Sequence, residues 1–253
     1  MNYNDGVYQG GLNASVYPHG DGTWIKKQSS SYESYSGEWE HGLFHGYGKY
    51  TGVDGKLLSG RWHKGDIQAG WERHINPGAG SYNGTFKNNR RHGQGVFSWP
   101  NGDKYTGEFK DGDIIGEGER SGFNGYRYEG TVLYGSPHVY GMETYPGDRS
   151  YKGGFQYGER HGRGVMNYPC GSSYEGRWES DNMYGRGVFE KRNEPDGEVL
   201  WSFSGIFEYG RPTKGVVQDF VHNTKYEHVF PADSCCIWCC ALTRMPRVLS
   251  VGG

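Results

Sequence analysis

A repeated segment of about 23 residues organises most of the chain. Each copy opens with a ring or Leu, has Gly two positions later, and has a second ring or Val two positions after that, as in Tyr105-Thr-Gly-Glu-Phe109. A regular period of this kind is the signature of a repeat array, in which each unit packs only against its neighbours. The eight opening residues are Tyr35, Leu58, Tyr82, Tyr105, Tyr128, Tyr151, Tyr174 and Phe203, and we interpret Tyr8 as the start of a degenerate ninth copy.

The pattern inside each copy predicts a β-hairpin. Ring and small or polar residues alternate with the period of a strand, and clusters of Pro, Asn, Asp and Gly close the copies. In the copy that opens at Tyr105 we expect strands over 105–110 and 116–121, a turn through Gly112, and the next turn at Asn124-Gly125. Glycine weakens a strand unless a neighbouring group needs the space, so we expect the repeated glycines to make room for rings.

The composition indicates what kind of core such hairpins can form. The chain has 45 Gly, 21 Tyr, 11 Phe and 8 Trp among its 253 residues, and it is poor in Leu, Ile and Val. It therefore lacks the aliphatic residues of a thick two-layer core, and the core must be thin and aromatic. With 27 basic and 29 acidic residues, the charge disfavours both disorder and a dedicated nucleic-acid surface.

The pattern YxGxWxxGxxHGxG, repeated in register, resembles that of the MORN repeat (membrane occupation and recognition nexus) family. The resemblance implies an all-β fold, an elongated, twisted, single-layer antiparallel sheet of consecutive hairpins. On this basis residues 1–34 form an N-terminal cap with the degenerate repeat, 35–215 form eight repeats, and 216–253 form a C-terminal cap and a cysteine-rich tail. Within the cap, residues 216–230 are expected to be a capping strand or a short helix.

Four departures from the repeat pattern are expected to have local consequences. Gln68-Ala69-Gly70-Trp71 replaces the HGxG step of the second copy, which predicts an irregular sheet there. In the fifth copy Val139 stands where the first Gly of that step belongs. Residues 191–195 form an insertion, interpreted as an exposed loop, and Thr213-Lys214-Gly215 replaces HGxG in the last copy.

We find no constellation of residues that would carry catalysis. His45, His92, His138 and His161 share one repeat position, but neighbouring copies are roughly 10 Å apart by strand spacing, too far for one metal ion. We therefore interpret them as structural turn residues. The chain lacks the GxSxG, HExxH, GxGxxG and GxxxxGK[ST] motifs. We expect no enzymatic activity, no metal and no cofactor.

The repeated rings have two interpretations that can both hold. They are the only residues apolar enough to form the core, and they can also line a groove for an amphipathic segment of a partner protein. The tyrosine hydroxyls are expected at an exposed rim, which suits an interface. The predicted groove residues are Tyr35, Trp39, Tyr82, Phe86, Tyr105, Phe109, Tyr128, Tyr151, Phe155, Tyr174 and Trp178.

The tail differs in composition from the repeats. Cys235, Cys236, Cys239 and Cys240 lie within six residues, beside Trp238 and close to Arg244 and Arg247. A zinc site lacks a second pair of ligands, and a disulfide framework is disfavoured because no secretory signal opens the chain. S-acylation that anchors the chain to a membrane and an inert tail both remain open.

These observations favour a non-enzymatic scaffold or adaptor that binds partner proteins. By resemblance, it would organise a cytoskeletal, ciliary or membrane-contact structure in the cytoplasm, and it can pair as a homodimer through a terminal strand. One alternative is a membrane-tethering or lipid-binding module that uses the cysteine cluster or basic turns. Another is a regulatory subunit that acts on an enzyme in trans.

Overall fold

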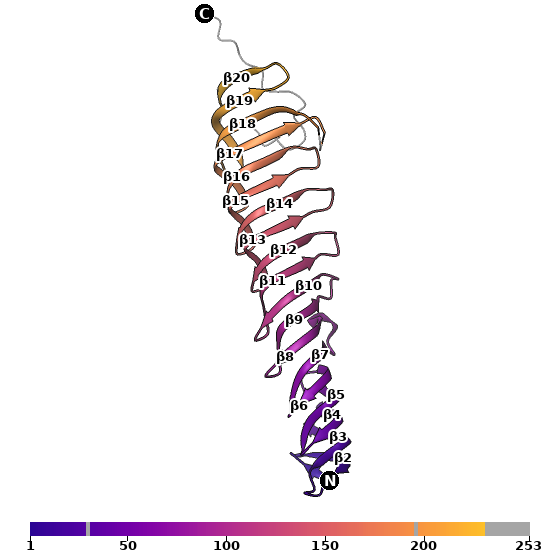
Figure 1. The fold of residues 1–253 in the computed structure, drawn as a ribbon. Coiled ribbons are helices and arrows are strands. Elements are labelled where there is room, and N and C mark those ends of the chain that lie inside the picture. Colours follow the sequence, from indigo (N-terminus) through magenta and orange to yellow (C-terminus); the bar gives the residue numbers. More distant parts are fainter. Residues whose placement is uncertain (29–30, 195–196, 231–253) are drawn as a thin grey trace, which may run out of the picture. The chain divides into compact units, whose positions relative to one another are not determined.

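The computed structural model describes residues 1–28, 31–194 and 197–230, which form antiparallel strands and one short 3-10 helix. The chain divides into two compact units, and Figure 1 labels strands of both. The first contains Met1–Phe123 and Val132–Gly135, and the second contains Asn124–Thr131 and the chain from Ser136 onward. Each unit is described by itself.

The first unit begins at the N-terminus. Its elements are β1 (Asn2–Tyr3), β2 (Gly6–Leu12), β3 (Pro18–Gln28), β4 (Ser31–Glu40), β5 (Leu43–Thr51), β6 (Lys56–His63), β7 (Asp66–His74), η1 (Pro77–Ala79), β8 (Ser81–Lys87), β9 (Arg90–Ser98), β10 (Lys104–Lys110) and β11 (Asp113–Ser121). Each strand pairs with the next along the chain.

The second unit continues the same pattern. Its strands are β12 (Arg127–Leu133), most of which belongs to this unit, β13 (Ser136–Thr144), β14 (Ser150–Gln156), β15 (Glu159–Asn167), β16 (Ser173–Glu179), β17 (Asn182–Arg192), β18 (Val199–Glu208), β19 (Arg211–Asp219) and β20 (Thr224–Val229). From β13 to β20 every strand pairs antiparallel with the next.

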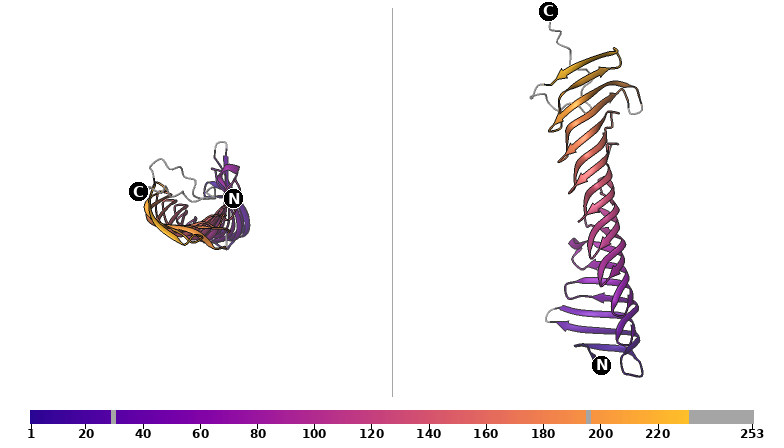
Figure 2. Two further views of the ribbon diagram at one scale, coloured as in Figure 1. Left: turned by 90° about the horizontal axis from the view of Figure 1, so that it is seen from above. Right: turned by 60° about the vertical axis from the view of Figure 1, so that its left-hand side comes forward.

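Each unit is one layer thick, as the two views of Figure 2 show. In the described part of each unit, neither a helix layer nor a second sheet covers the strands. Among these residues, no helix is long and apolar enough to cross a membrane. A single-layer sheet has to bury its rings against its own backbone, and the turns and bulges show how it does so.

Tight two-residue turns join the strands of most hairpins. Both turn residues have positive φ, as in Asp111 (54°) with Gly112 (105°) and Tyr157 (50°) with Gly158 (91°). This is the type I′ turn, whose twist matches that of the strands it connects. The turn amide then bonds to the preceding hairpin, since the Gly112 N–H donates to the Arg91 carbonyl oxygen at 2.9 Å.

A large bulge interrupts the pairing in the middle of most hairpins. Between β4 and β5, Gly37 pairs with Gly48 and Trp39 pairs with Phe44, so one residue on β4 faces three on β5. The middle residue of the three is Gly46, whose φ of 53° lies in the left-handed region that favours glycine. This explains the first Gly of the HGxG step.

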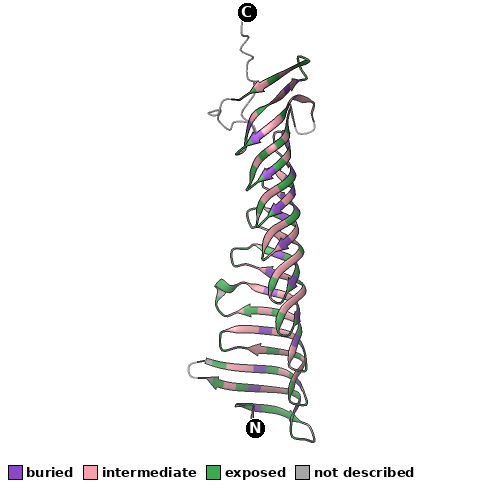
Figure 3. Cartoon of the chain, turned by 90° about the vertical axis from the view of Figure 1, so that its left-hand side faces the viewer, coloured by how far each residue is buried: buried purple, intermediate pink, exposed green. Residues whose placement is uncertain are grey.

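The buried residues lie together along the strands of each unit, and Figure 3 shows them in purple. They include the ring that opens each repeat and the ring or Val two positions after its Gly. The expected all-β fold, a single-layer antiparallel arrangement of consecutive hairpins, is confirmed.

Of the two alternatives for residues 216–230, the capping strand is the one observed, because Val216–Asp219 complete β19 and Thr224–Val229 form β20, which pairs with it. The prediction that the insertion is an exposed loop is wrong at its start, since Lys191 and Arg192 still pair with Trp201 and Val199 at the end of β17. In the hairpin of β10 and β11 the second strand starts at Asp113, earlier than expected, because the type I′ turn needs only two residues.

Candidate protein-binding face

The tyrosine that opens a repeat packs directly on two glycines of its own hairpin. A Cβ added to Gly118 would lie 2.5 Å from Cε2 of Tyr105, and one added to Gly107 would lie 2.5 Å from the Tyr105 hydroxyl oxygen. Neither distance leaves room for a side chain, so close approach of the ring requires glycine on both strands. The ring of Tyr105 is thereby only 1% exposed.

The hydroxyl group of these tyrosines bonds at the bulge. It donates to the carbonyl oxygen three residues further on, which belongs to the single residue that faces the bulge. Tyr35 donates to Glu38 at 3.0 Å and Tyr151 donates to Gly154 at 3.0 Å. The same bond is made by Tyr8, Tyr82, Tyr105, Tyr128 and Tyr174. Each tyrosine therefore fills the interior and satisfies a backbone acceptor.

The ring at the fifth position connects consecutive hairpins. Trp178 lies edge-on to Tyr174 of its own repeat, at 5.3 Å between ring centroids, and to Tyr151 of the preceding repeat, at 5.2 Å. Its indole N–H donates to the Gly164 carbonyl oxygen of the preceding hairpin at 3.3 Å. Trp39 and Trp62 make equivalent bonds to Gly22 and Gly48. Edge-to-face contact adds stability beyond the area that the rings bury.

Burial also sets the acidity of the tyrosines. Loss of solvent raises the pKa of Tyr82 and of Tyr105 to about 12, because the charged phenolate is poorly solvated inside the sheet. The pKa values of Tyr35, Tyr151 and Tyr174 are raised further above their usual range for the same reason. All of these groups are neutral hydrogen-bond donors near pH 7.

The predicted exposed rim of tyrosine hydroxyls is wrong. The hydroxyls are turned inward to the backbone, and the eleven residues predicted to line a groove have exposed fractions between 0% and 5%. In this structure they form the core, and partner binding through them stays a prediction. Any surface for a partner that needs no rearrangement must lie elsewhere.

The opposite side of each sheet, which we call the open face, is exposed. Successive strand residues point to opposite sides, so the residues beside the buried rings and the glycines point to the open face. In the first unit Trp71 and Tyr47 lie there, exposed by 52% and 73%. Trp71 borders a groove of about 490 Å³ that is also lined by Leu57 and Ser59. Exposed rings beside a groove are typical of protein-binding surfaces.

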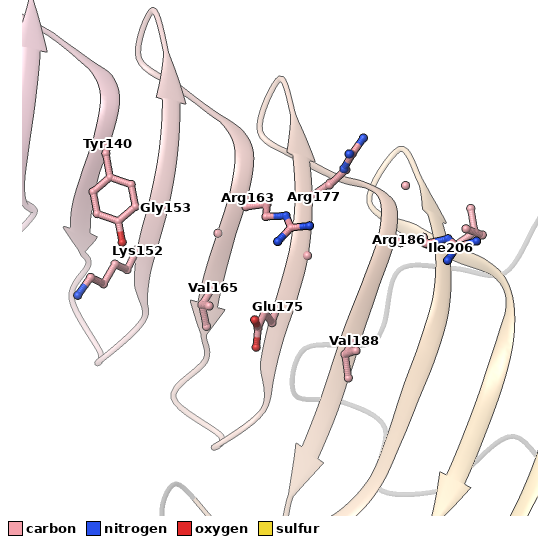
Figure 4. Close-up of a pocket in the computed structure, with 13 residues that line it drawn as sticks. Tyr140, Lys152, Gly153, Arg163, Val165, Glu175, Arg177, Arg186, Val188 and Ile206 are labelled. Atoms are coloured by element: carbon pink, nitrogen blue, oxygen red, sulfur yellow. The ribbon is translucent and has the colours of Figure 1, made fainter.

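The open face of the second unit has a groove of different character. It has a volume of about 810 Å³ and is lined by Lys152, Arg163, Arg177, Arg186 and Val188, with Glu175 as its acidic residue (Figure 4). The arginines are exposed. Within the residues that the structure describes, none of the three arginines forms an ion pair.

Comparison with known families agrees with the repeated geometry. The MORN repeat matches five segments of the chain, residues 35–56, 82–104, 128–147, 151–173 and 174–194. The chain is a MORN-repeat protein. MORN repeats are generally non-enzymatic and commonly mediate protein or membrane interactions. No curated protein matches the chain.

The MORN hairpins that depart most from the pattern are built with a shorter bulge. Between β6 and β7, Gly60 pairs with Gly70 and Trp62 pairs with Ile67, so one residue faces only two. The hairpin of β18 and β19 has the same arrangement. With one residue fewer, no left-handed glycine is needed, which explains why both hairpins lack the HGxG step. The expected irregularity of the second copy is this smaller bulge.

The last MORN hairpin also replaces the tyrosine hydroxyl. Phe203 is fully buried at the tyrosine position but has no hydroxyl. Thr213, which takes the place of the usual His-Gly step, donates its hydroxyl to the Ile206 carbonyl oxygen at 3.2 Å. Ile206 is the residue three positions after Phe203, so the same acceptor is satisfied from the other strand.

The histidines of the MORN repeats make local contacts, which agree with the structural interpretation. Nδ1 of His92 accepts the Asp111 N–H at 3.4 Å, and Nδ1 of His138 accepts the Tyr157 N–H at 3.3 Å. His45 lies 3.0 Å from Glu40. No cluster of three or more potential metal ligands occurs among the described residues.

Two arginines of the basic turns, which were an alternative site for membrane contact, have other roles in the MORN structure. Arg91 pairs with Glu72 and Arg160 pairs with Asp181, so these turn arginines are not free to bind a surface. The four cysteines at positions 235, 236, 239 and 240 lie outside the described residues, and their acylation stays a prediction.

Sequence reasoning missed the residues of the open face. Arg163 and Arg177 each stand next to a glycine of the repeat, so the alternation was visible in the sequence. What it could not give was the face, because a one-residue error in the assumed register would move every side chain of a strand to the other face.

Proposed function

We propose that this MORN-repeat protein is a non-enzymatic cytoplasmic scaffold that binds a partner protein on the open face of its sheets. The observation that carries the proposal is Trp71, which is 52% exposed in the middle of β7 although no turn or loop requires it there. Every other tryptophan of the described residues is buried or half-buried. An exposed tryptophan beside a groove is the residue type that dominates binding energy at protein interfaces.

The separation of the two faces supports this proposal. Stability comes from the face of the tyrosines and glycines, so the open face is free to vary in sequence without loss of fold. The open faces of the two units expose the rings of Tyr47, Trp71 and Tyr140 and the charges of Arg163 and Arg177. A scaffold needs this division between a constant interior and a variable surface.

The cellular setting is part of the same proposal. A role at a cytoskeletal, ciliary or membrane-contact structure rests on the behaviour of MORN repeats in general. Among the residues that the structure describes, β20 pairs with no strand of the second unit other than β19, so a second copy that paired with β20 would extend the scaffold.

Affinity capture with quantitative mass spectrometry tests the proposal. The full chain is compared with a Trp71→Ser/Tyr47→Ser variant and with a Tyr157→Ser/Tyr209→Ser control. The control removes turn tyrosines that are 74% and 82% exposed, so it changes as much exposed ring surface away from the open face. Circular dichroism verifies that each variant is folded.

We expect specific proteins to be captured by the full chain and by the control, and lost with the open-face variant. Capture of the same proteins by all three chains would show that the open face of the first unit is not the binding surface. The absence of any specific protein with the full chain would contradict the scaffold function itself.

A further inference from the structure

Four cations of the second unit lie in a row that crosses the strands. Arg163 on β15 pairs directly with Arg177 on β16. On β17, Arg186 pairs with Ile206, and Ile206 pairs with Lys214 on β19. Like charges directly opposite each other on neighbouring strands are destabilising. No ion pair among the described residues offsets this repulsion, so the fold alone does not explain why the cations lie in a row.

The same row in the first unit is not basic. Its members include Tyr47 opposite Arg61 and Gln94 opposite Glu108, while Thr85 occupies the corresponding place on β8. The repeat therefore does not require cations at these positions. The basic row is a property of the second unit.

A second row, with apolar members, runs beside the first. Val165 lies between Lys152 and Glu175 on the neighbouring strands, and Glu175 pairs in turn with Val188. Val188 is 37% exposed although it is apolar. The groove of about 810 Å³ continues into a neighbouring one of about 520 Å³, which shares Arg186 and Val188 and reaches Lys214. A row of cations and a mixed row, in which Val165 and Val188 alternate with Lys152 and Glu175, thus run along one hollow (Figure 4).

We propose that this basic groove, formed by Lys152, Arg163, Arg177, Arg186, Lys214 and Val188, binds an acidic, extended segment of a partner protein in which carboxylates alternate with apolar side chains. The proposal rests on the scaffold function above and names the chemistry of its partner.

Charge and spacing both fit such a segment. The groove contains five cations and one carboxylate, Glu175, so it has an excess of positive charge. Neighbouring strands are about 4.8 Å apart and alternate residues of an extended peptide about 6.6 Å apart, so each carboxylate of the segment lies within reach of a long basic side chain. Arginine, which forms two parallel hydrogen bonds with a carboxylate, occupies three of the five positions.

Two other anionic partners fit less well. A flat membrane surface cannot fill a hollow of about 810 Å³. A single-stranded nucleic acid needs aromatic rings on which its bases stack, and Tyr140 is the aromatic residue of this groove. Both remain outcomes of the experiment below.

Fluorescence anisotropy with a labelled (Glu-Val)4 peptide and the full chain tests the proposal. A (Ser-Val)4 peptide is the neutral comparison. We expect the acidic peptide to bind, and its affinity to fall roughly tenfold or more in an Arg163→Glu/Arg177→Glu/Arg186→Glu variant. The control is Lys87→Glu/Lys104→Glu/Lys110→Glu, which reverses three exposed cations of the first unit and should leave binding unchanged. An Arg→Lys triple variant, which keeps the charge but loses the paired hydrogen bonds, should bind with intermediate affinity.

A stability measurement separates binding from a structural role. Arg177→Glu should leave the thermal unfolding temperature unchanged or raise it, because it removes the like-charge pair with Arg163. A marked fall in unfolding temperature would show that the arginines support the fold, and would overturn the proposal.

Three further outcomes overturn the proposal. Equal binding of (Glu-Val)4 to the groove variant and to the control would show that the peptide is attracted non-specifically to the protein and not bound at the groove. Binding of phosphatidylserine vesicles or of a labelled oligonucleotide that depends on the arginines, with no binding of the peptide, would reassign the groove. If the peptide does not bind while affinity capture still finds a partner that depends on Trp71 and Tyr47, the scaffold function stands and the basic groove fails.

Discussion

At the scale of single residues, the contact between Tyr105 and Gly118 shows how a one-layer sheet obtains an interior. The ring is covered by its own hairpin, and the glycine makes this possible by having no side chain. Sequence reasoning predicted that the glycines make room for rings. It did not predict the inward hydroxyl, because the pattern contains no sign of the bulge that supplies the acceptor.

Gly118→Ala should lower the free energy of unfolding by about 1–3 kcal/mol, because the added Cβ overlaps the Tyr105 ring. Denaturant titration measures the change. Gly78→Ala is the control, since the atom nearest to its added Cβ is 3.4 Å away. Equal effects of the two substitutions would mean that the ring does not pack on Gly118.

Val139→Gly should stabilise the protein by about 1 kcal/mol. Val139 has a φ of 60°, a strained conformation for a β-branched residue, and it is 64% exposed, so little buried surface is lost. Gly162→Val is the reverse change at the equivalent position, where φ is 74° and no atom lies near the added Cβ. It should destabilise. Thermal unfolding of both variants checks the opposite signs, and effects of the same sign would refute the strain.

The buried tyrosines predict sensitivity to alkali. A tyrosine has an ordinary pKa of 10.0, and burial raises that of Tyr82 and Tyr105 to about 12. The folded state therefore binds these protons more tightly than the unfolded state. Their stabilising contribution is complete below pH 10 and is lost as the pH rises towards 12.

Titration from pH 8 upward, followed by circular dichroism and tyrosinate absorbance, tests this prediction. Loss of β-structure should accompany ionisation above about pH 10. A Tyr105→Phe variant has one buried phenol fewer to ionise. Its free energy of unfolding should therefore fall less between neutral and alkaline pH than that of the unchanged protein. Full ionisation of the tyrosines with the sheet intact would contradict the burial described above.

At the scale of elements, hairpins and their order follow from the sequence, whereas the lengths of the bulges do not. Turn residues and the 23-residue period place the hairpins of the eight repeats. The shorter bulges at β6–β7 and β18–β19 were visible only as missing motifs, because a deletion of one residue can be absorbed in a turn, a strand or a bulge. Of the two alternatives for residues 216–230, the strand forms and the helix does not, because pairing with β19 outweighs the weak helix signal of Asp219.

Thr213→Val should lower stability by about 0.5–1.5 kcal/mol, because it removes the hydroxyl that donates to Ile206 while keeping the shape of the side chain. Adding Phe203→Tyr to this variant should restore most of the loss, since a tyrosine at this position supplies the hydroxyl that the other repeats use. Denaturant titration of the single and double variants measures both steps. Two independent, additive losses would exclude the exchange of one donor for another.

At the scale of the whole molecule, the two faces of each unit have different roles. In each unit, rings and glycines form the interior on one face, and the open face carries exposed Trp71 and Tyr47 in the first unit and the basic groove in the second. Sequence analysis predicted the rings, the repeat and the interaction function of the family. It based partner binding on an exposed rim of tyrosine hydroxyls, which the structure contradicts because these hydroxyls donate to backbone carbonyl oxygens inside the hairpins.

Hydroxyl-radical footprinting with mass spectrometry tests this division of faces most directly. On the intact chain, Tyr35, Tyr82, Tyr105 and Tyr151 should be protected, while Tyr47 and Tyr140, exposed by 73% and 52%, should be modified readily along with Trp71. Comparable modification of both groups would place the repeated tyrosines at a surface and contradict the division of the sheet into a buried face and an open face.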